Sequence, residues 1–233
     1  MSHLSRRQLL ASLAASPVVA LGIGAYSRAA HAQAAGAGPI APNVCMVMPE
    51  TTAGPYYFDP GIVRADITEG LEGVPLTLKL QVVDATCVPL AGARVDVWQC
   101  DAEGNYSGYR QNAGGDTSNK TFLRGTQMTD EAGLVTFDSI YPGWYPGRTT
   151  HVHYKVFLDE TTVLTSQIFF PDTLSDAIYA TVAPYDTRGA AHRTMNTDDF
   201  IARQIGDGGY AAIREQTGRY TADLVVGVDP GPL

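Results

Sequence analysis

The sequence predicts an all-β fold, a sandwich of two sheets with long loops and a few short helices. Residues 76–83 and 93–100 show the two-residue periodicity of half-buried strands. Short apolar segments separated by turn residues continue along most of the chain, and the helical pattern is weak before residue 173. Many short strands with turns between them are typical of a sandwich.

The elements are expected in the following order. Residues 76–83 form the first strand, residues 84–92 turn the chain, and residues 93–100 return beside the first strand. The further strand candidates are residues 134–137, 151–157, 165–169 and 224–228. The expected short helices are residues 173–182, 198–205 and 211–215. Residues 107–125 are polar and rich in glycine, which predicts a long loop lining a site at one end of the sandwich.

The first 32 residues have the pattern of a twin-arginine export signal. Arg6 and Arg7 precede a mildly apolar run, and Ala30-His31-Ala32 matches an A-x-A cleavage site. The run is too short and too weakly apolar to span a membrane. We therefore expect a signal peptide over residues 1–32, a flexible linker over 33–43 and one folded domain over 44–233. The mature protein would be periplasmic or secreted.

The charge of the chain argues against two classes of partner. The formal charge of the 233 residues is −8, and it becomes −11 without the leader's three arginines. Such an acidic surface disfavours binding to nucleic acid and to anionic membranes.

The three cysteines would meet an oxidising compartment after export. One disulfide with one free thiol is the simplest pairing of Cys45, Cys87 and Cys100. Cys87 and Cys100 are expected at opposite ends of neighbouring strands, which disfavours that pair. Cys45 with either partner stays open. Because no Cys-x-x-Cys spacing occurs, a zinc–thiolate site is disfavoured.

Residues 141–153 hold the strongest candidate metal ligands, in the order Tyr-Pro-Gly-Trp-Tyr-Pro-Gly-Arg-Thr-Thr-His-Val-His. Alternate residues of a strand face the same side, so His151 and His153 can present two imidazoles to one point. Tyr145 follows a Pro-Gly turn that can fold its phenol over that point. These groups suit a hard, oxidised metal ion, although a His-x-His pair alone is often a surface pair.

Tyr106 is a further candidate, because it lies on a loop just beyond a predicted strand end. Functional side chains often occupy such loops, which a rigid scaffold positions. With 12 tyrosines in the chain, an exposed loop tyrosine carries little weight by itself. Considered together with the 141–153 segment, Tyr106 becomes a stronger candidate.

Together these segments resemble the intradiol ring-cleavage dioxygenases, non-haem iron(III) enzymes that open catechols between the two hydroxyls. The similarity lies in Trp-Gln-Cys-Asp-Ala-Glu-Gly-Asn-Tyr-Ser over residues 98–107, in the 141–153 segment, and in Ser-Gln-Ile-Phe-Phe over 166–170. Residues 52–56, Thr-Ala-Gly-Pro-Tyr, resemble the segment that lines the substrate pocket in this family. The similarity runs in order from about residue 50 to 172.

The resemblance implies a role for each matched position. The implied iron(III) ligands are Tyr106, Tyr145, His151 and His153, with Tyr145 and His151 as the axial pair. The implied catalytic residues are Tyr145, which would take a substrate proton, Arg148 and Gln167. The implied substrate-binding residues are Thr52, Gly54, Pro55 and Tyr56. The cofactor would be Fe(3+), and catechol-type substrates with O2 would give cis,cis-muconate-type products.

The sequence also departs from the best-known members of the family. Catechol and hydroxyquinol enzymes carry a helical N-terminal region for dimerisation, and no such pattern precedes Tyr106 here. We therefore expect a protocatechuate-type or secreted single-domain catalytic unit, and homo-oligomerisation stays open. Two other interpretations are a non-catalytic sandwich that binds a metal or a catechol, and a zinc hydrolase. The two tyrosines would have no purpose in the latter.

Overall fold

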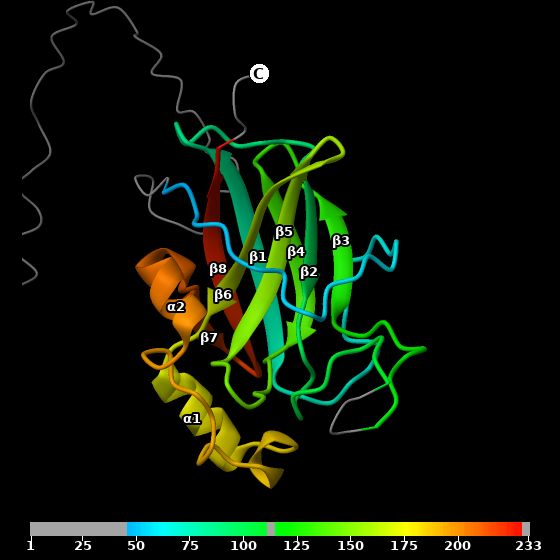
Figure 1. Cartoon of the computed structure of the whole chain (residues 1–233), viewed down its shortest axis with the longest axis vertical. Coiled ribbons are helices and arrows are strands. Elements are labelled where there is room, and N and C mark those ends of the chain that lie inside the picture. Colours follow the sequence, from blue (N-terminus) through cyan, green and yellow to red (C-terminus); the bar gives the residue numbers. More distant parts are fainter. Residues whose placement is uncertain (1–45, 111–114, 230–233) are drawn as a thin grey trace, which may run out of the picture. The chain divides into compact units, whose positions relative to one another are not determined.

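Two four-stranded sheets form a β-sandwich, which confirms the predicted fold class (Figure 1). The computed structural model describes residues 46–110 and 115–229. One sheet has the strand order β4-β1-β8-β7 and the other β3-β2-β5-β6. The strands are β1 (Pro75–Asp84), β2 (Arg94–Trp98), β3 (Arg124–Met128), β4 (Leu134–Ile140), β5 (His151–Leu158), β6 (Thr161–Phe169), β7 (Ala212–Gln216) and β8 (Arg219–Val228).

The predicted leader, residues 1–32, and the linker, residues 33–43, lie outside the described residues, so both stay predictions, as does export. Within the part of the chain that the structure describes, no helix is long and apolar enough to cross a membrane.

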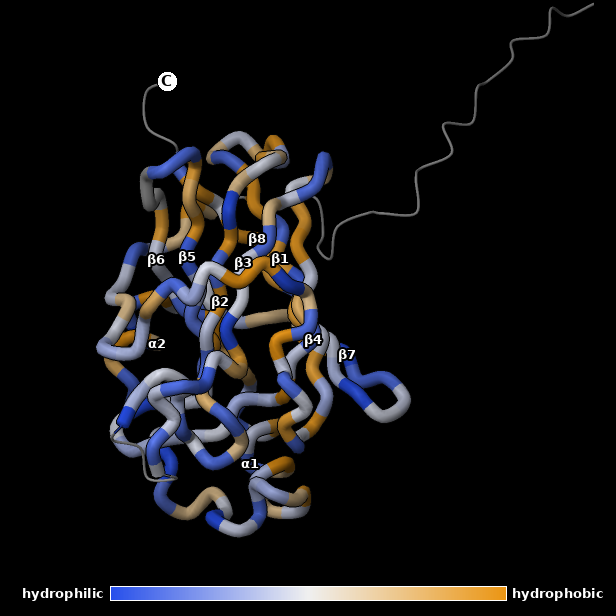
Figure 2. Tube along the Cα trace, turned by 90° about the vertical axis from the view of Figure 1, so that its right-hand side faces the viewer, coloured by the Kyte–Doolittle hydropathy of each residue, from blue (hydrophilic) through white to orange (hydrophobic). Residues whose placement is uncertain are grey.

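Alternating burial along the strands explains why these segments form sheets. On β1, Leu76, Leu78 and Leu80 are at most 2 % exposed, and the intervening Lys79 is only partly buried. Figure 2 shows hydrophobic residues gathered along the strands, whereas the connecting loops are mostly hydrophilic. The six strands expected from periodicity are confirmed in type and approximate position.

Three expectations about the sheets are wrong. The second strand does not lie beside the first, because β1 pairs with β4 and β8 whereas β2 pairs with β3 and β5. Strand β3 begins inside the predicted long loop, residues 107–125, and was not expected. Its polar and small residues show no apolar alternation. Residues 211–215, expected to be helical, lie mostly in β7, an exposed edge strand that pairs with β8.

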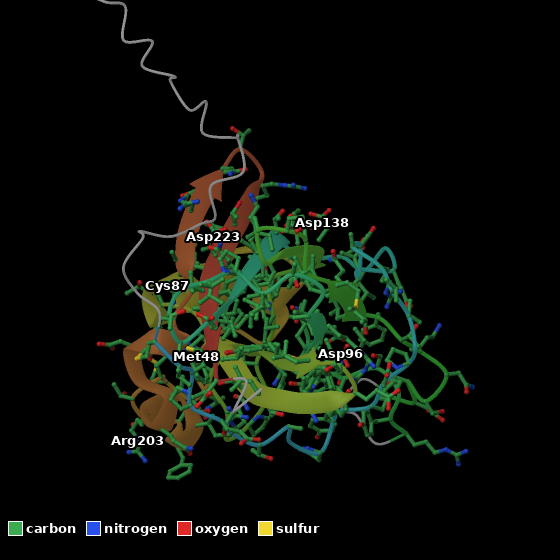
Figure 3. The ribbon with its side chains drawn as sticks, turned by 90° about the horizontal axis from the view of Figure 1, so that it is seen from above. Met48, Cys87, Asp96, Asp138, Arg203 and Asp223 are labelled. Carbon is green, nitrogen blue, oxygen red and sulfur yellow. The ribbon has the colours of Figure 1, made fainter. Side chains whose placement is uncertain are left out.

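The helices all follow β6 in the sequence. The α-helices are α1 (Asp172–Thr181) and α2 (Phe200–Ile205), and the short 3-10 helices are η1 (Tyr185–Thr187) and η2 (Gly206–Gly209). Helix α2 begins after Asp199, whose carboxylate accepts hydrogen bonds from the amides of Ile201 and Ala202. Arg203 projects outward from this helix (Figure 3).

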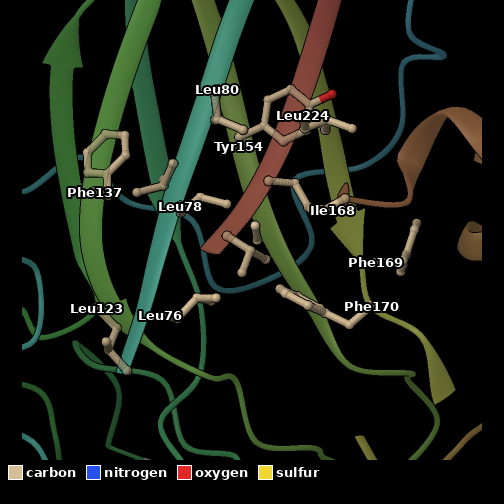
Figure 4. Close-up of a cluster of buried hydrophobic side chains, with 14 of the residues drawn as sticks. Leu76, Leu78, Leu80, Leu123, Phe137, Tyr154, Ile168, Phe169, Phe170 and Leu224 are labelled. Atoms are coloured by element: carbon tan, nitrogen blue, oxygen red, sulfur yellow. The ribbon is translucent and has the colours of Figure 1, made fainter. Parts of the chain in front are cut away.

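The core lies between the two sheets. Figure 4 shows Leu78, Leu80 and Leu224 of the first sheet among Tyr154 and Ile168 of the second, and all five are at most 4 % exposed. Burying a large apolar side chain contributes about 1.5–3 kcal/mol. This packing fixes the ends of the strands, from which the site loops emerge.

The cysteines agree with the expectation that Cys87 and Cys100 do not pair with each other. Cys87 is disulfide-bonded, and Cys100 is free and buried. Neither the Cys87–Cys100 pair nor a Cys45–Cys100 pair is therefore formed. Cys45 itself lies outside the described residues.

Candidate metal centre

Four predicted ligands from three segments meet at one end of the sandwich. Tyr106 lies on the β2–β3 connection, Tyr145 on the β4–β5 connection, and His151 and His153 at the start of β5 (Figure 1). The Nε2 atoms of His151 and His153 are 3.0 Å apart, and the Tyr145 hydroxyl lies 3.0 Å from His151 Nε2. The Tyr106 hydroxyl is 3.4 Å from the same nitrogen and 3.5 Å from the Tyr145 hydroxyl.

A glycine allows the two tyrosine-bearing loops to approach. The amide of Gly143 donates to the carbonyl of Asp101 over 3.0 Å, and the Cys100 thiol donates to the carbonyl of Gly143. A Cβ atom at residue 143 would lie 2.4 Å from the carbonyl oxygen of Ala102 and 2.5 Å from that of Asp101. Only glycine therefore fits at this contact without moving backbone.

Replacing Gly143 by alanine should destabilise the fold by about 1–3 kcal/mol, because the methyl group must push two backbone segments apart. The measurement is the free energy of unfolding in denaturant. An unchanged free energy of unfolding in Gly143→Ala would contradict the proposed close contact.

Both imidazoles are held in a defined orientation. His151 Nδ1 lies 2.6 Å from the carbonyl oxygen of Thr149, so this nitrogen is protonated and donates a hydrogen bond to that oxygen. The Nε2 lone pair therefore faces the two tyrosine hydroxyls and His153. The ring of His153 stacks on Trp98, with centroids 4.8 Å apart and planes 8° apart. Trp98 therefore packs against one face of the His153 ring and restricts its rotation. His153 Nδ1 is buried without a hydrogen-bond partner in the described part of the chain.

Burial keeps the four groups uncharged when no cation is present. Burial, with the nearby Arg148 cation, lowers the pKa of His151 to about 3, and burial lowers the pKa of His153 well below its ordinary value. Burial likewise raises the pKa of the Tyr106 and Tyr145 phenols above their ordinary value. Neutral imidazoles are metal donors, and a multivalent cation would reverse the penalty on the phenolates.

The donor set fits a single hard metal ion. Nitrogen and oxygen donors bound at about 2.0–2.2 Å to one ion lie about 3–3.6 Å from one another, which is the spacing found here. Phenol oxygens and imidazole nitrogens together suit iron better than soft metals. Among the described residues, no group of three or more His, Cys, Asp or Glu side chains provides another such cluster.

Arg148 and Gln167 lie together beside the ligands. The Arg148 guanidinium donates through Nη2 to the Gln167 side-chain oxygen and through Nε to Asp199 over 2.8 Å. Gln167 pairs with His153 across β5 and β6, and it is fully buried. Because arginine can only donate, the Gln167 oxygen must face it, and the amide Nε2 then has no partner among the described residues.

The residues predicted to bind substrate are partly brought to the cluster. The Tyr56 ring stacks on Tyr106 with centroids 4.4 Å apart, and a Cβ at Gly54 would lie 3.6 Å from His153 Cε1. Thr52 and Pro55 are exposed, and the Thr52 hydroxyl accepts the amide of Gly54 over 3.0 Å. Gly54 and Tyr56 therefore lie against the ligands, while Thr52 shapes their loop.

Asp199 contacts the candidate site, and sequence reasoning did not connect it with that site. It lies in the expected helix 198–205, but nothing in the sequence connects that segment with the ligands. An aspartate before an apolar helical run predicts a helix cap. Only the tertiary structure shows that its second oxygen reaches Arg148.

Comparison with known proteins identifies relatives. A family described as "Dioxygenase" matches residues 53–200. An intradiol ring-cleavage dioxygenase from Tetranychus urticae is 34% identical with a TM-score of 0.72, over 80% of this chain and 96% of that one. The dioxygenase domain of a carbohydrate-binding fusion from Streptomyces sp. SirexAA-E is 28% identical with a TM-score of 0.61, over 80% of this chain and 100% of that one.

Curated relatives are longer. A hydroxyquinol 1,2-dioxygenase from Rhizobium sp. (strain MTP-10005) is 31% identical over 153 residues, which cover 55% of this chain and 50% of that protein. The chain thus spans about half the length of the curated relatives it matches.

Proposed function

The chain belongs to the intradiol ring-cleavage dioxygenase family, and from this premise we propose that it is an iron(III)-dependent enzyme that cleaves catechol-type rings between the two hydroxyls. The observation that carries the proposal is the convergence of two phenols and two imidazoles around His151 Nε2, which lies within 3.4 Å of both hydroxyls and of His153 Nε2. O2 would be the second substrate and a cis,cis-muconate-type acid the product.

Tyr106, Tyr145, His151 and His153 would hold the iron. A bound trivalent cation keeps buried phenols ionised at neutral pH, and these hard anionic donors favour iron(III) over iron(II). Iron held there would supply the redox chemistry for the reaction of a catechol with O2. The neighbouring side chains then have to accept protons, hold the ring and stabilise negative charge.

Tyr106 and Tyr145 differ in how tightly their side chains are packed, which suggests different roles. Tyr106 is 1 % exposed and lies under the stacked ring of Tyr56. Tyr145 is only partly buried and directly precedes the Pro146–Gly147 turn of the β4–β5 connection. Tyr145 would therefore be the phenol whose Oη accepts a catechol proton, whereas Tyr106 would stay in place. Proton transfer of this kind contributes about 10²- to 10⁴-fold to a rate.

Arg148 and Gln167 would act on the substrate ring. The Arg148 side chain is 19 % exposed and is tethered at two nitrogens, so its charge stays near the ligands. A fixed cation stabilises negative charge that develops on the ring during the reaction. Gln167 presents a buried amide N–H that has no partner in the part of the chain that the structure describes, and this group could donate to a substrate oxygen.

Gly54 and Tyr56 would contact the substrate ring. Tyr56 also lies edge-on to Tyr145, with ring centroids 6.2 Å apart. Its aromatic face keeps water from the phenols on that side. Thr52 and Pro55, which are exposed, would form the outer part of the same segment.

The iron-loaded mature protein should show a red to burgundy absorption band, because phenolate-to-iron(III) charge transfer absorbs visible light. The measurement is an absorption spectrum before and during anaerobic addition of catechol or protocatechuate, followed by O2 uptake. A band that shifts with one catechol supports the site and ranks the substrates.

Two outcomes would contradict the proposal. A colourless protein with stoichiometric iron would mean that no phenolate binds the metal. A band that shifts with every catechol tested but no O2 uptake would indicate a binding module instead of an enzyme.

A further inference from the structure

We propose that Asp199 is a positioning residue for the reaction, which holds the Arg148 guanidinium at a set place beside the iron ligands. This inference rests on the proposed function. Asp199 lies about 50 residues beyond the ligand segment, in a part of the chain without a recognisable site motif.

The Asp199 carboxylate is fully buried and uses both oxygens. Oδ2 accepts from Arg148 Nε over 2.8 Å and from the amide of Thr149 over 2.9 Å. Oδ1 accepts from the amides of Ile201 over 2.8 Å and Ala202 over 3.0 Å. One side chain therefore connects the start of α2 with the segment that leads into β5.

The connection reaches the ligands through a short path. The Thr149 carbonyl accepts the Nδ1 proton of His151, and the Thr149 hydroxyl donates to Asn196 over 2.8 Å. The backbone between Arg148 and His151 is thus anchored to residues 196–199. Arg148 and His151 consequently keep a constant position relative to each other.

Asp199 supplies the charged tether of Arg148. An arginine side chain has about 2 kcal/mol of rotamer entropy, so a guanidinium held only by a neutral amide samples more positions. Burial alone would raise the pKa of Asp199, but the bonds from Arg148 and two backbone amides hold it below its ordinary value. The carboxylate is therefore ionised, and the pair is charge-balanced within the protein.

A purely structural role as a helix cap is the competing explanation, and one substitution separates the two. Asp199→Asn keeps an oxygen for the amides of Ile201 and Ala202, and asparagine caps helices as well as aspartate does. Its amide NH2 would then face the N–H groups of Arg148 and Thr149, which cannot accept a hydrogen bond. The substitution therefore preserves the cap of helix α2 and removes the hydrogen-bonded ion pair with Arg148.

Asp199→Asn in the iron-loaded protein should lower kcat on catechol by about 10- to 100-fold, the usual cost of losing a group that orients a metal site. The iron content and the visible band of the resting protein should stay close to those of the wild type, while the unfolding midpoint falls because the N–H groups of Arg148 and Thr149 lose their buried acceptor. Asp198→Asn, at the exposed neighbouring carboxylate, is the matched control and should leave kcat unchanged.

A double-mutant cycle tests whether the effect passes through Arg148. In the Arg148→Ala background, Asp199→Asn should change kcat by no more than about 2-fold, because the group it positions is already absent. An unchanged kcat in the single variant, an equal loss in both backgrounds, or loss of iron would each overturn the inference.

Failure of the proposed function is recognisable separately. It would appear as a wild-type protein without turnover of any catechol. The same cycle is then measured on anaerobic catechol affinity, where coupling between residues 148 and 199 still supports the positioning role and additivity overturns it.

Discussion

Replacing Tyr145 by phenylalanine should lower kcat on catechol by about 10²- to 10⁴-fold, the contribution expected of a group that accepts a proton in the reaction. The hydroxyl removed lies 3.0 Å from His151 Nε2 and 3.5 Å from the Tyr106 hydroxyl, so one phenolate donor is lost as well. The visible band should shift but persist, because Tyr106 still donates. Steady-state kinetics and the absorption spectrum measure both effects.

Tyr220→Phe is the matched control, since it removes one phenol hydroxyl from a partly buried position on β8. It should leave kcat and the spectrum as they are. If Tyr145→Phe retained full activity on catechols, Tyr145 would be neither ligand nor proton acceptor, and its assignment would be wrong.

The second large effect is expected at Arg148. Arg148→Lys should lower kcat by about 10²- to 10³-fold, comparable to the loss of a preorganised donor that stabilises developing charge. Lysine keeps the positive charge, but it cannot donate to Gln167 and Asp199 together as the planar guanidinium does. Kinetics with parallel iron analysis are the measurement, and the resting spectrum should not change because no ligand is altered.

Arg203→Lys provides the comparison, because Arg203 is exposed on α2 and lies in the same part of the chain. A full loss of iron or of colour in Arg148→Lys would show that Arg148 maintains the metal site itself. Wild-type kinetics in this variant would remove Arg148 from the proposed reaction.

The candidate ligands His151 and His153 could be recognised from the sequence because their signal is local and chemical. The His151–Val152–His153 spacing places two imidazoles on one face of a strand whatever the sheet order is. Resemblance to a family then joined them with Tyr106, which is 45 residues away from His151. The loop predicted over residues 107–125 overlaps the start of β3, and periodicity did not reveal this strand because its polar and small residues show no apolar alternation.

The wrong elements share a physical cause. A two-residue period identifies which side of a strand is buried, but it does not name the neighbouring strand, so β2 was placed beside β1. Residues 212–216 favour a helix by composition, yet pairing with β8 along an open sheet edge makes them a strand. In both cases contacts between distant segments outweighed local preference.

By itself, the sequence determined the sandwich class, the strands with clear alternation, and the candidate ligands Tyr145, His151 and His153, because each depends on residue type and short spacing; the family resemblance added Tyr106. The tertiary structure alone decided the order of the strands, the approach of the two tyrosine loops at Gly143, and the reach of Asp199 to Arg148. These features depend on contacts between segments far apart in the chain, and such contacts form only when the common core brings the segments together.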